Sequence, residues 1–329
     1  MFTRRQFGLG LAAASIVAPT VVRAQSPIRL RLAHATAEVH PGHIAALRFK
    51  EALDKLVPGK VNLQIFPNRQ LGDDKPNLEA TVAGTIDMCM ASGVLFPLVT
   101  GRPALDAVQQ PFLIRDYDHF GKMSLSPQGQ ALLDDLAPAG IVGLQMTDIG
   151  QRNFLTINKP VRKMADFAGL KTRIVPVPLH KAIWEMAGTS PVGLPYGEVY
   201  GAMQTKVIDA VEINVSSILG ENLWEVGKSL TLTGHYPWHA IIACNKAKFD
   251  SLPKDIQDAM REAGRSSVMP TLAYAKEQDF SARTALKAKG VQILELEDLP
   301  EMKKKMAPII EQYSAKSPLI ANFVKAAQS

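Results

Sequence analysis

Two stretches of the chain carry one pattern and together decide the fold: Leu78–Ser92 (LEATVAGTIDMCMAS) and Tyr200–Asn214 (YGAMQTKVIDAVEIN). Each begins at helical spacing, passes through the pair Ile-Asp, and continues as a mostly apolar run that ends on a polar residue. A helix followed directly by a short apolar strand is the second half of a βαβ unit. Because the pattern occurs twice at one constant offset, we expect two lobes of similar construction.

The same alternation of strands and helices extends outward through both halves of the chain. Residues 28–35 and 60–66 alternate apolar and polar side chains as strands do, and residues 42–57 between them have helical spacing. Strands separated by helices form mostly parallel sheets flanked by helices. The predicted strands are 28–35, 60–66, 86–91, 170–175, 190–194 and 208–213, and the predicted helices are 42–57, 75–83, 179–187 and 198–205.

Three further segments predict how the chain passes between the lobes. Residues 141–147, 154–157 and 240–243 look extended, which makes them candidate hinge strands. The chain after residue 250 is helical in pattern, and Pro270 is expected to end or kink the first of these helices. The expected domains are residues 25–147 with about 237–270 for the first lobe, 148–236 for the second, and about 271–329 for C-terminal helices that pack across both.

The first 24 residues have the pattern of an export signal. Arg4 and Arg5 form a basic start, an apolar run continues to Val22, and we expect cleavage after about Ala24. The arginine pair favours twin-arginine export, although ordinary secretory signals also contain two arginines. The apolar run is shorter than the ~20 residues of a membrane span, so a retained anchor is the weaker interpretation. We therefore expect a soluble, periplasmic mature protein.

Composition and motifs exclude several classes of function. The chain has 37 basic and 31 acidic residues, a balance too mild and too evenly spread to indicate a nucleic-acid partner. The sequence contains no nucleophile elbow, phosphate loop or His-Glu-x-x-His motif, so we expect neither an enzyme nor a cofactor. The pairs His40/His43 and His235/His239 contain internal prolines and lack a third ligand nearby, so no metal site is predicted.

The two cysteines, Cys89 and Cys244, both lie in apolar runs. Buried free thiols are therefore the default expectation. One disulfide in an oxidising compartment is the alternative, and the sequence leaves it open.

Polar residues stand where four of the predicted strands end. These are His34 and Ser92 in the first half, and Arg173 and Asn214 in the second. Parallel α/β sheets bind ligands outside the carboxyl ends of their strands, so two facing lobes would bring these side chains to one cleft. Strand ends often carry polar residues without any function, and that interpretation stays open for each residue taken singly.

A series of motifs stands in a specific joint order and spacing: Gln70–Asp74, Gly150–Asn153, Asp166–Arg173, Gly197–Gln204 with Ile208–Asn214, and Phe249–Pro253. In these motifs the chain resembles the substrate-binding proteins of tripartite ATP-independent periplasmic (TRAP) transporters, the DctP-type family. The resemblance runs from about residue 28 to 300 and implies a two-lobed, periplasmic binding protein-like α/β fold with hinge strands and a long C-terminal helix region. It also implies a receptor that closes on an organic acid and delivers it to membrane permease subunits.

The resemblance also implies which side chains bind the ligand. The arginine that clamps the ligand carboxylate falls on Arg173, Arg152 assists it, Asn214 faces the cleft, and an aromatic residue that packs on the ligand falls on Tyr196. The planar guanidinium group matches a carboxylate with two parallel hydrogen bonds. Trp238, beside a crossing strand, is the best candidate among the tryptophans.

Alternatives remain for the two arginines and for several of the other candidates. Arg173 could instead form a structural ion pair, and nearby Asp148 could pair with Arg152. His34 could be merely structural, and Tyr196 could be a helix-start residue packed in the core.

The expected ligand is a small monocarboxylate, namely a hydroxy, oxo or aromatic acid. Sialic-acid receptors of this family carry an acid and an arginine after the third strand, whereas here the stretch Ala91–Phe96 has no charge. We therefore expect no large polyhydroxylated sugar acid. A C4-dicarboxylate is the alternative ligand, and a receptor for an ABC importer or for a sensor kinase is the alternative role. We expect a monomer.

Overall fold

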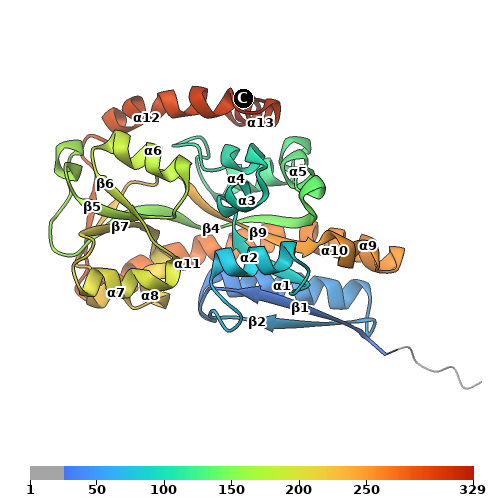
Figure 1. The fold of residues 1–329 in the computed structure, drawn as a ribbon. Helices are drawn as coiled ribbons and strands as arrows, with labels where there is room; N and C mark the ends of the chain where they lie inside the picture. Colours follow the sequence, from blue (N-terminus) through green and yellow to red (C-terminus); the bar gives the residue numbers. More distant parts are fainter. Residues whose placement is uncertain (1–25) are drawn as a thin grey trace, which may run out of the picture.

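The computed structural model describes residues 26–329, and the predicted export signal lies outside them. Ten strands form one mixed sheet in the order β2-β1-β3-β9-β4-β7-β5-β6, with β8 beside β4 and β10 beside β8. Figure 1 shows β4 and β9 between β1 and β2 on one side and β5, β6 and β7 on the other. Their bounds are β1 Ile28–His34, β2 Val61–Phe66, β3 Met88–Ser92, β4 Ile141–Thr156, β5 Lys171–Ile174, β6 Ser190–Gly193, β7 Ala210–Asn214, β8 Ser229–Leu232, β9 Pro237–Asn245 and β10 Gln292–Glu295.

Helices flank both halves of this sheet, as the two-lobed α/β prediction requires. We call the part around β1, β2 and β3 the first lobe and the part around β5, β6 and β7 the second lobe. The helices are α1 Pro41–Leu56, α2 Asp74–Val82, α3 Leu95–Thr100, α4 Tyr117–Ser124, α5 Pro127–Asp134, α6 Pro178–Ala187, α7 Val199–Gln204, α8 Val215–Gly220, α9 Lys246–Asp250, α10 Lys254–Ser266, α11 Val268–Ala288, α12 Leu299–Ser314 and α13 Pro318–Gln328.

The repeated pattern of the sequence corresponds to the same arrangement in both lobes. In the first lobe β1 lies between β2 and β3 and is parallel to both, and in the second lobe β5 lies between β6 and β7 and is parallel to both. The strands that end in Ser92 and Asn214 therefore occupy equivalent places. A one-residue register shift would move their apolar side chains away from the buried faces, so burial holds this register.

The connection between the lobes differs from the sequence prediction in one respect. The two extended segments expected at 141–147 and 154–157 are parts of a single strand, β4, which pairs with β9 from Ile141 to Gln151 and with β7 from Arg152 to Thr156. The register with β9 shifts between Asp148 and Gln151. The sequence did not predict one continuous strand, because the bulge interrupts the two-residue alternation of apolar and polar side chains that a strand normally has.

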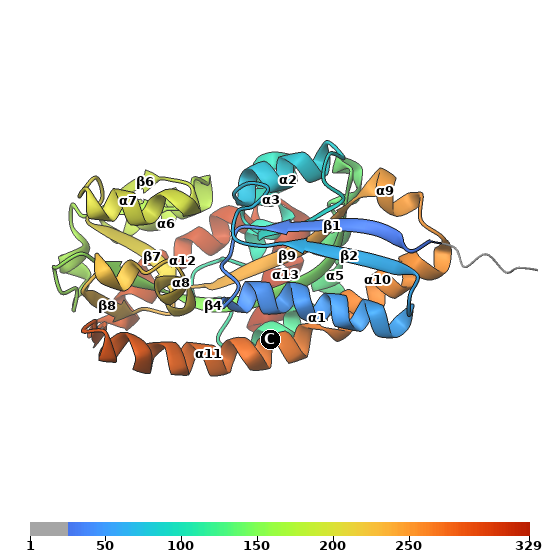
Figure 2. The ribbon, with the colours of Figure 1, turned by 90° about the horizontal axis from the view of Figure 1, so that it is seen from below.

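The C-terminal helices pack on both lobes. The helix α10 ends at Ser266 and α11 begins at Val268, so Pro270 stands in the first turn of a new helix, which agrees with the predicted interruption. Figure 2 shows α11 running along both lobes, and α12 lies on α6 whereas α13 lies on α4 and α5. The strand β10 within this region was not predicted.

Cys89 and Cys244 are buried and free, as expected by default. No helix within residues 26–329 is long and apolar enough to span a membrane.

Candidate functional site

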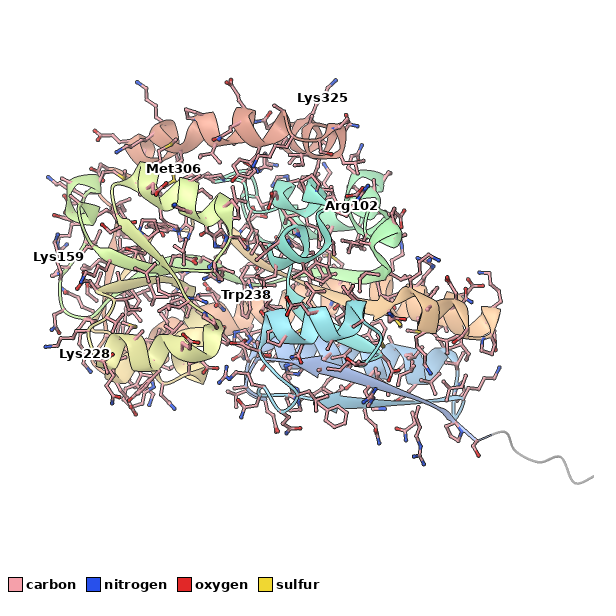
Figure 3. All side chains as sticks on the ribbon, in the orientation of Figure 1. Arg102, Lys159, Lys228, Trp238, Met306 and Lys325 are labelled. Carbon is pink, nitrogen blue, oxygen red and sulfur yellow. The ribbon has the colours of Figure 1, made fainter. Side chains whose placement is uncertain are left out.

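A cavity of about 400 Å³ lies between the two lobes, at the carboxyl ends of the parallel strands. Figure 3 labels Trp238, which lies where the two halves of the ribbon meet. The side chains around the cavity come from both lobes and from the crossing strands. They are Asp73, Asp74, Lys75, Pro76, Glu79, Ser92, Leu95, Arg152, Arg173, Val175, Pro176, Pro195, Tyr196, Glu198, Ile213, Ser217 and Trp238.

Arg173 enters this cavity from β5. Its side chain is only 2% exposed, and its Nε donates a hydrogen bond to the Leu194 carbonyl oxygen at 3.0 Å. Within residues 26–329, no carboxylate forms a salt bridge with it, so the alternative of a structural ion pair is not observed. Burial lowers the pKa of Arg173 to about 10, because the charged group has lost its water without gaining a direct counter-ion.

Arg152, in contrast, already has a partner. Its Nε donates to the Glu212 carboxylate, and a terminal nitrogen donates to the Glu212 carbonyl oxygen at 2.5 Å. The alternative pairing with Asp148 is wrong, because the Asp148 carboxylate accepts from the Gly150 backbone and from Gln151 instead. Arg152 and Glu212 belong to adjacent antiparallel strands, whose register brings them to one face.

The surroundings of Glu212 keep it ionised. His180 and His235 lie 3.6 and 3.8 Å from its carboxylate oxygens. Burial alone would raise the pKa of Glu212, but the charge and the hydrogen bond of Arg152 outweigh it and lower that pKa below its ordinary value. The charge of Arg152 is thus compensated within the protein.

Three more of the predicted residues line the cavity. The Ser92 Oγ and the Tyr196 hydroxyl are buried and have no hydrogen-bond partner within the described part of the chain. The rings of Tyr196 and Trp238 lie 5.9 Å apart, and the Arg152 guanidinium lies 6.0 Å from the Trp238 ring. Buried polar atoms without partners are rare in folded proteins, so these two hydroxyls are suited to a bound polar molecule.

The sequence profile described as bacterial extracellular solute-binding protein, family 7, matches residues 32–317. The chain belongs to this family, DctP. It is 32% identical over 293 residues to the C4-dicarboxylate-binding periplasmic protein DctP of Rhodobacter capsulatus, covering 88% of this chain and 87% of that protein. It is 29% identical over 288 residues to the 2,3-diketo-L-gulonate-binding periplasmic protein YiaO of Escherichia coli, covering 88% and 86%.

Solved structures of DctP-family receptors have the same fold. A TRAP periplasmic solute-binding protein from Bradyrhizobium sp. in complex with galacturonate superposes with a TM-score of 0.86, at 29% identity, covering 91% of this chain and 99% of that one. The sugar acid binding protein DctPAm from Advenella mimigardefordensis in complex with galactonate has a TM-score of 0.86, at 26% identity, covering 92% and 98%. The family consists of TRAP transporter receptors for small acids and is periplasmic, so this DctP-family chain is a receptor and not an enzyme.

Two predicted residues of this DctP-family receptor lie outside the cavity lining. His34 is buried, and its ring nitrogens lie 3.1 Å from His43 and 2.9 Å from the Thr36 hydroxyl. The Asn214 amide nitrogen contacts His40 and the Ile149 carbonyl oxygen, each at 3.3 Å. Both side chains are therefore engaged by neighbours, and their predicted contact with a ligand stays a prediction.

The sequence prediction missed the acidic residues of the receptor's cavity, which are Asp73, Asp74, Glu79 and Glu198. Asp74 is 8% exposed, and its carboxylate accepts a hydrogen bond from the Ser92 backbone at 3.2 Å. Burial, with the charge of Asp73 adding to it, raises the pKa of Asp74 to about 7. The motif Gln70–Asp74 contained a usable signal, since two adjacent acids at a helix start after a parallel strand face the ligand edge of the sheet.

Proposed function

We propose that this receptor binds a hydroxylated monocarboxylate, a hydroxy acid or a six-carbon sugar acid, and delivers it to the TRAP permease. The observation that carries the proposal is the difference between the two arginines of the cavity. Arg152 is neutralised by Glu212, whereas Arg173 has no carboxylate partner within residues 26–329. One uncompensated guanidinium group matches one ligand carboxylate.

The remaining charges of the cavity support hydroxyl groups on the rest of the ligand. Lys75 is paired with Glu79 at 2.5 Å, so it adds no free positive charge. Asp73, Asp74 and Glu198 can accept hydrogen bonds from hydroxyl groups but would repel a second ligand carboxylate. Ser92 and Tyr196 can donate or accept in addition.

We expected no large polyhydroxylated acid because the residues after β3 carry no charge. The hydroxyl acceptors proposed here come instead from the start of α2 and from the second lobe. Relatives bound to galacturonate and galactonate fit this arrangement. A cavity of about 400 Å³ lies near the lower end of the range for small-molecule sites, which favours a six-carbon acid over a larger one.

A C4-dicarboxylate is the second candidate, because Arg152 also lines the cavity and a relative carries that ligand in its name. A dicarboxylate would require Arg152 to bind the second ligand carboxylate while it stays paired with Glu212. Oxo and aromatic monocarboxylates share the carboxylate but offer fewer hydroxyl groups to the acidic side chains of the cavity. We further propose that export removes about the first 24 residues and that the mature receptor is a monomer.

A thermal-shift screen followed by calorimetry tests this function. The panel contains galacturonate, galactonate and gluconate, with malate and succinate as dicarboxylates, mandelate as an aromatic acid, and galactose as the matched neutral sugar. A ligand at ~100 times its dissociation constant should stabilise the receptor by about 2.7 kcal/mol. We expect the sugar acids to raise the melting temperature and galactose to leave it unchanged. A shift with dicarboxylates alone, or an equal shift with galactose, would contradict the proposal.

A further inference from the structure

The loop between β2 and α2 presents one arginine, Arg69, to the opposite lobe. Asn68 and Arg69 have φ values of 51° and 61°, in the left-handed region that side chains other than glycine rarely adopt. Backbone hydrogen bonds hold them there, from Asn68 to Thr36 at 2.9 Å and from Arg69 to His34 at 3.2 Å. These hydrogen bonds keep the loop in its unusual backbone conformation and thereby fix the direction of the Arg69 side chain. Backbone conformations of this kind are often found at functional sites.

Arg69 uses this position to bridge the two lobes. Its two terminal nitrogens donate to the two carboxylate oxygens of Glu221 at 3.1 and 2.8 Å, and one of them also donates to the Ala35 carbonyl oxygen at 3.1 Å. Glu221 follows α8 in the second lobe. The side chains are 27% and 13% exposed, so solvent screens this two-pronged pair less than it screens the surface pairs.

Arg69 lies one layer behind the ligand cavity and does not line it. Its guanidinium carbon lies 5.4 Å from the centre of the Tyr196 ring. Tyr196 itself lines the cavity. A Cβ added to the neighbouring Gly197 would lie 3.2 Å from the Arg69 side chain, and the Gly197 backbone donates to the Asp73 carboxylate at 2.9 Å. The first lobe therefore packs closely against the Tyr196 segment in this arrangement of the lobes.

We infer that Arg69 is a positioning residue: through Glu221 it holds the lobes closed, and through the Tyr196 ring it supports the wall of the cavity without touching the ligand. This inference rests on the proposed function in one respect, that the ligand occupies the cavity lined by Tyr196. Closure excludes water from the Arg173 site, so a contact that favours the closed state slows ligand release. His40 also bridges the lobes, to Ser217 at 3.1 Å, so the fold does not depend on Arg69 alone.

A double-mutant cycle with Arg69→Ala and Glu221→Ala tests the inference, using galacturonate as the first probe. We expect each single variant to raise the dissociation constant about fivefold, mostly through faster release, with the association rate little changed. The dissociation constant of the double variant should be no higher than that of either single variant, because the two side chains act as one pair. Arg69→Lys should restore part of the loss. The matched control is Arg102→Ala, which removes an arginine paired with Asp135 within the first lobe.

A second readout needs no ligand. Spectroscopic labels on cysteines introduced at the exposed Lys55 and Lys181, one in each lobe, report the distance between the lobes. We expect Arg69→Ala to lower the closed fraction and Arg102→Ala to leave it unchanged. Unaltered release rates and distances in the single variants, or losses that add in the double variant, would overturn the inference. If no acid binds the wild-type receptor, the proposed function fails, while the distance measurement still decides the role of Arg69.

Discussion

Arg152 and Glu212 form a buried ion pair beneath the ligand cavity, with side chains that are 3% and 0% exposed. The pair joins β4, which crosses between the lobes, to β7 of the second lobe. A buried pair of this kind contributes little net stability compared with apolar residues, but the loss of one partner leaves an uncompensated charge. The pair therefore neutralises the charge of Arg152 and leaves Arg173 as the arginine of the cavity whose charge is not compensated.

Replacement of Arg173 by alanine should abolish measurable binding. Without Arg173 the ligand carboxylate would be desolvated but unpaired, which makes the binding free energy less favourable by about 3–5 kcal/mol. The affinity then falls by more than about 100-fold. Arg173→Lys should recover only part of the affinity, because an ammonium group offers a point charge without the planar fork. Calorimetry with galacturonate measures the affinities of both variants, and circular dichroism checks that each variant keeps its fold. Near-wild-type affinity of Arg173→Ala would disprove the carboxylate clamp.

Replacement of Glu212 by glutamine should destabilise the receptor strongly. The change removes the charge that compensates Arg152 in a fully buried site, so we expect the free energy of unfolding to fall by about 3–5 kcal/mol. Glu79→Gln is the control, because Glu79 belongs to a half-exposed pair with Lys75 and should change stability by less than about 1 kcal/mol. Urea denaturation compares the two variants, and equal midpoints would count against the argument.

The contribution of Asp148 to the stability of the receptor should fall as the pH rises toward 8. Burial raises the pKa of Asp148 from 3.8 to about 8, so the folded protein keeps a proton there that the unfolded chain has already lost. The share of the free energy of unfolding that Asp148 contributes then decreases between about pH 4 and pH 8, by at most about 1.4 kcal/mol per pH unit, and levels off above. Buried histidines whose pKa is lowered, such as His40 and His239, contribute in the opposite direction below about pH 6.5. Asp148→Asn should remove this downward contribution of Asp148, so the stability of the variant should fall less, or rise more, with pH than that of the wild type. Asp118→Asn, on the exposed face of α4, should leave the pH dependence unchanged. Denaturation curves at several pH values measure the slopes, and an unaltered slope in Asp148→Asn would refute this assignment.

Gly93, directly after β3, should tolerate no side chain. A Cβ there would lie 1.8 Å from Nε2 of His239, which is fully buried beside it. Gly93→Ala should therefore lower the free energy of unfolding by at least about 1–3 kcal/mol, because the crowded core must shift. Gly201→Ala is the matched control: no atom lies within 4 Å of its added Cβ, and a helical alanine is favoured over glycine by about 0.5–1 kcal/mol. If both variants melt alike, steric crowding at Gly93 is not the constraint.

Much of the fold could be predicted because it depends on local patterns. The spacing of apolar residues in stretches such as Leu78–Ser92 identified the βαβ units, and their repetition identified two lobes. The position of Arg173 at a strand end followed from the same pattern, since parallel strands bring their carboxyl ends to one edge. The continuous strand β4 could not be predicted, because its bulge between Asp148 and Gln151 breaks the local period.

The sequence alone thus determined the export signal as a prediction, the α/β architecture, the family and the first candidate for the carboxylate clamp. Only the tertiary structure decided which charges meet. Arg152 pairs with Glu212 and not with nearby Asp148, and Arg69 reaches Glu221 across the cleft. The physical reason is that a short-range periodicity sets secondary structure, whereas an ion pair needs two atoms within about 4 Å, and the register of distant strands sets that distance.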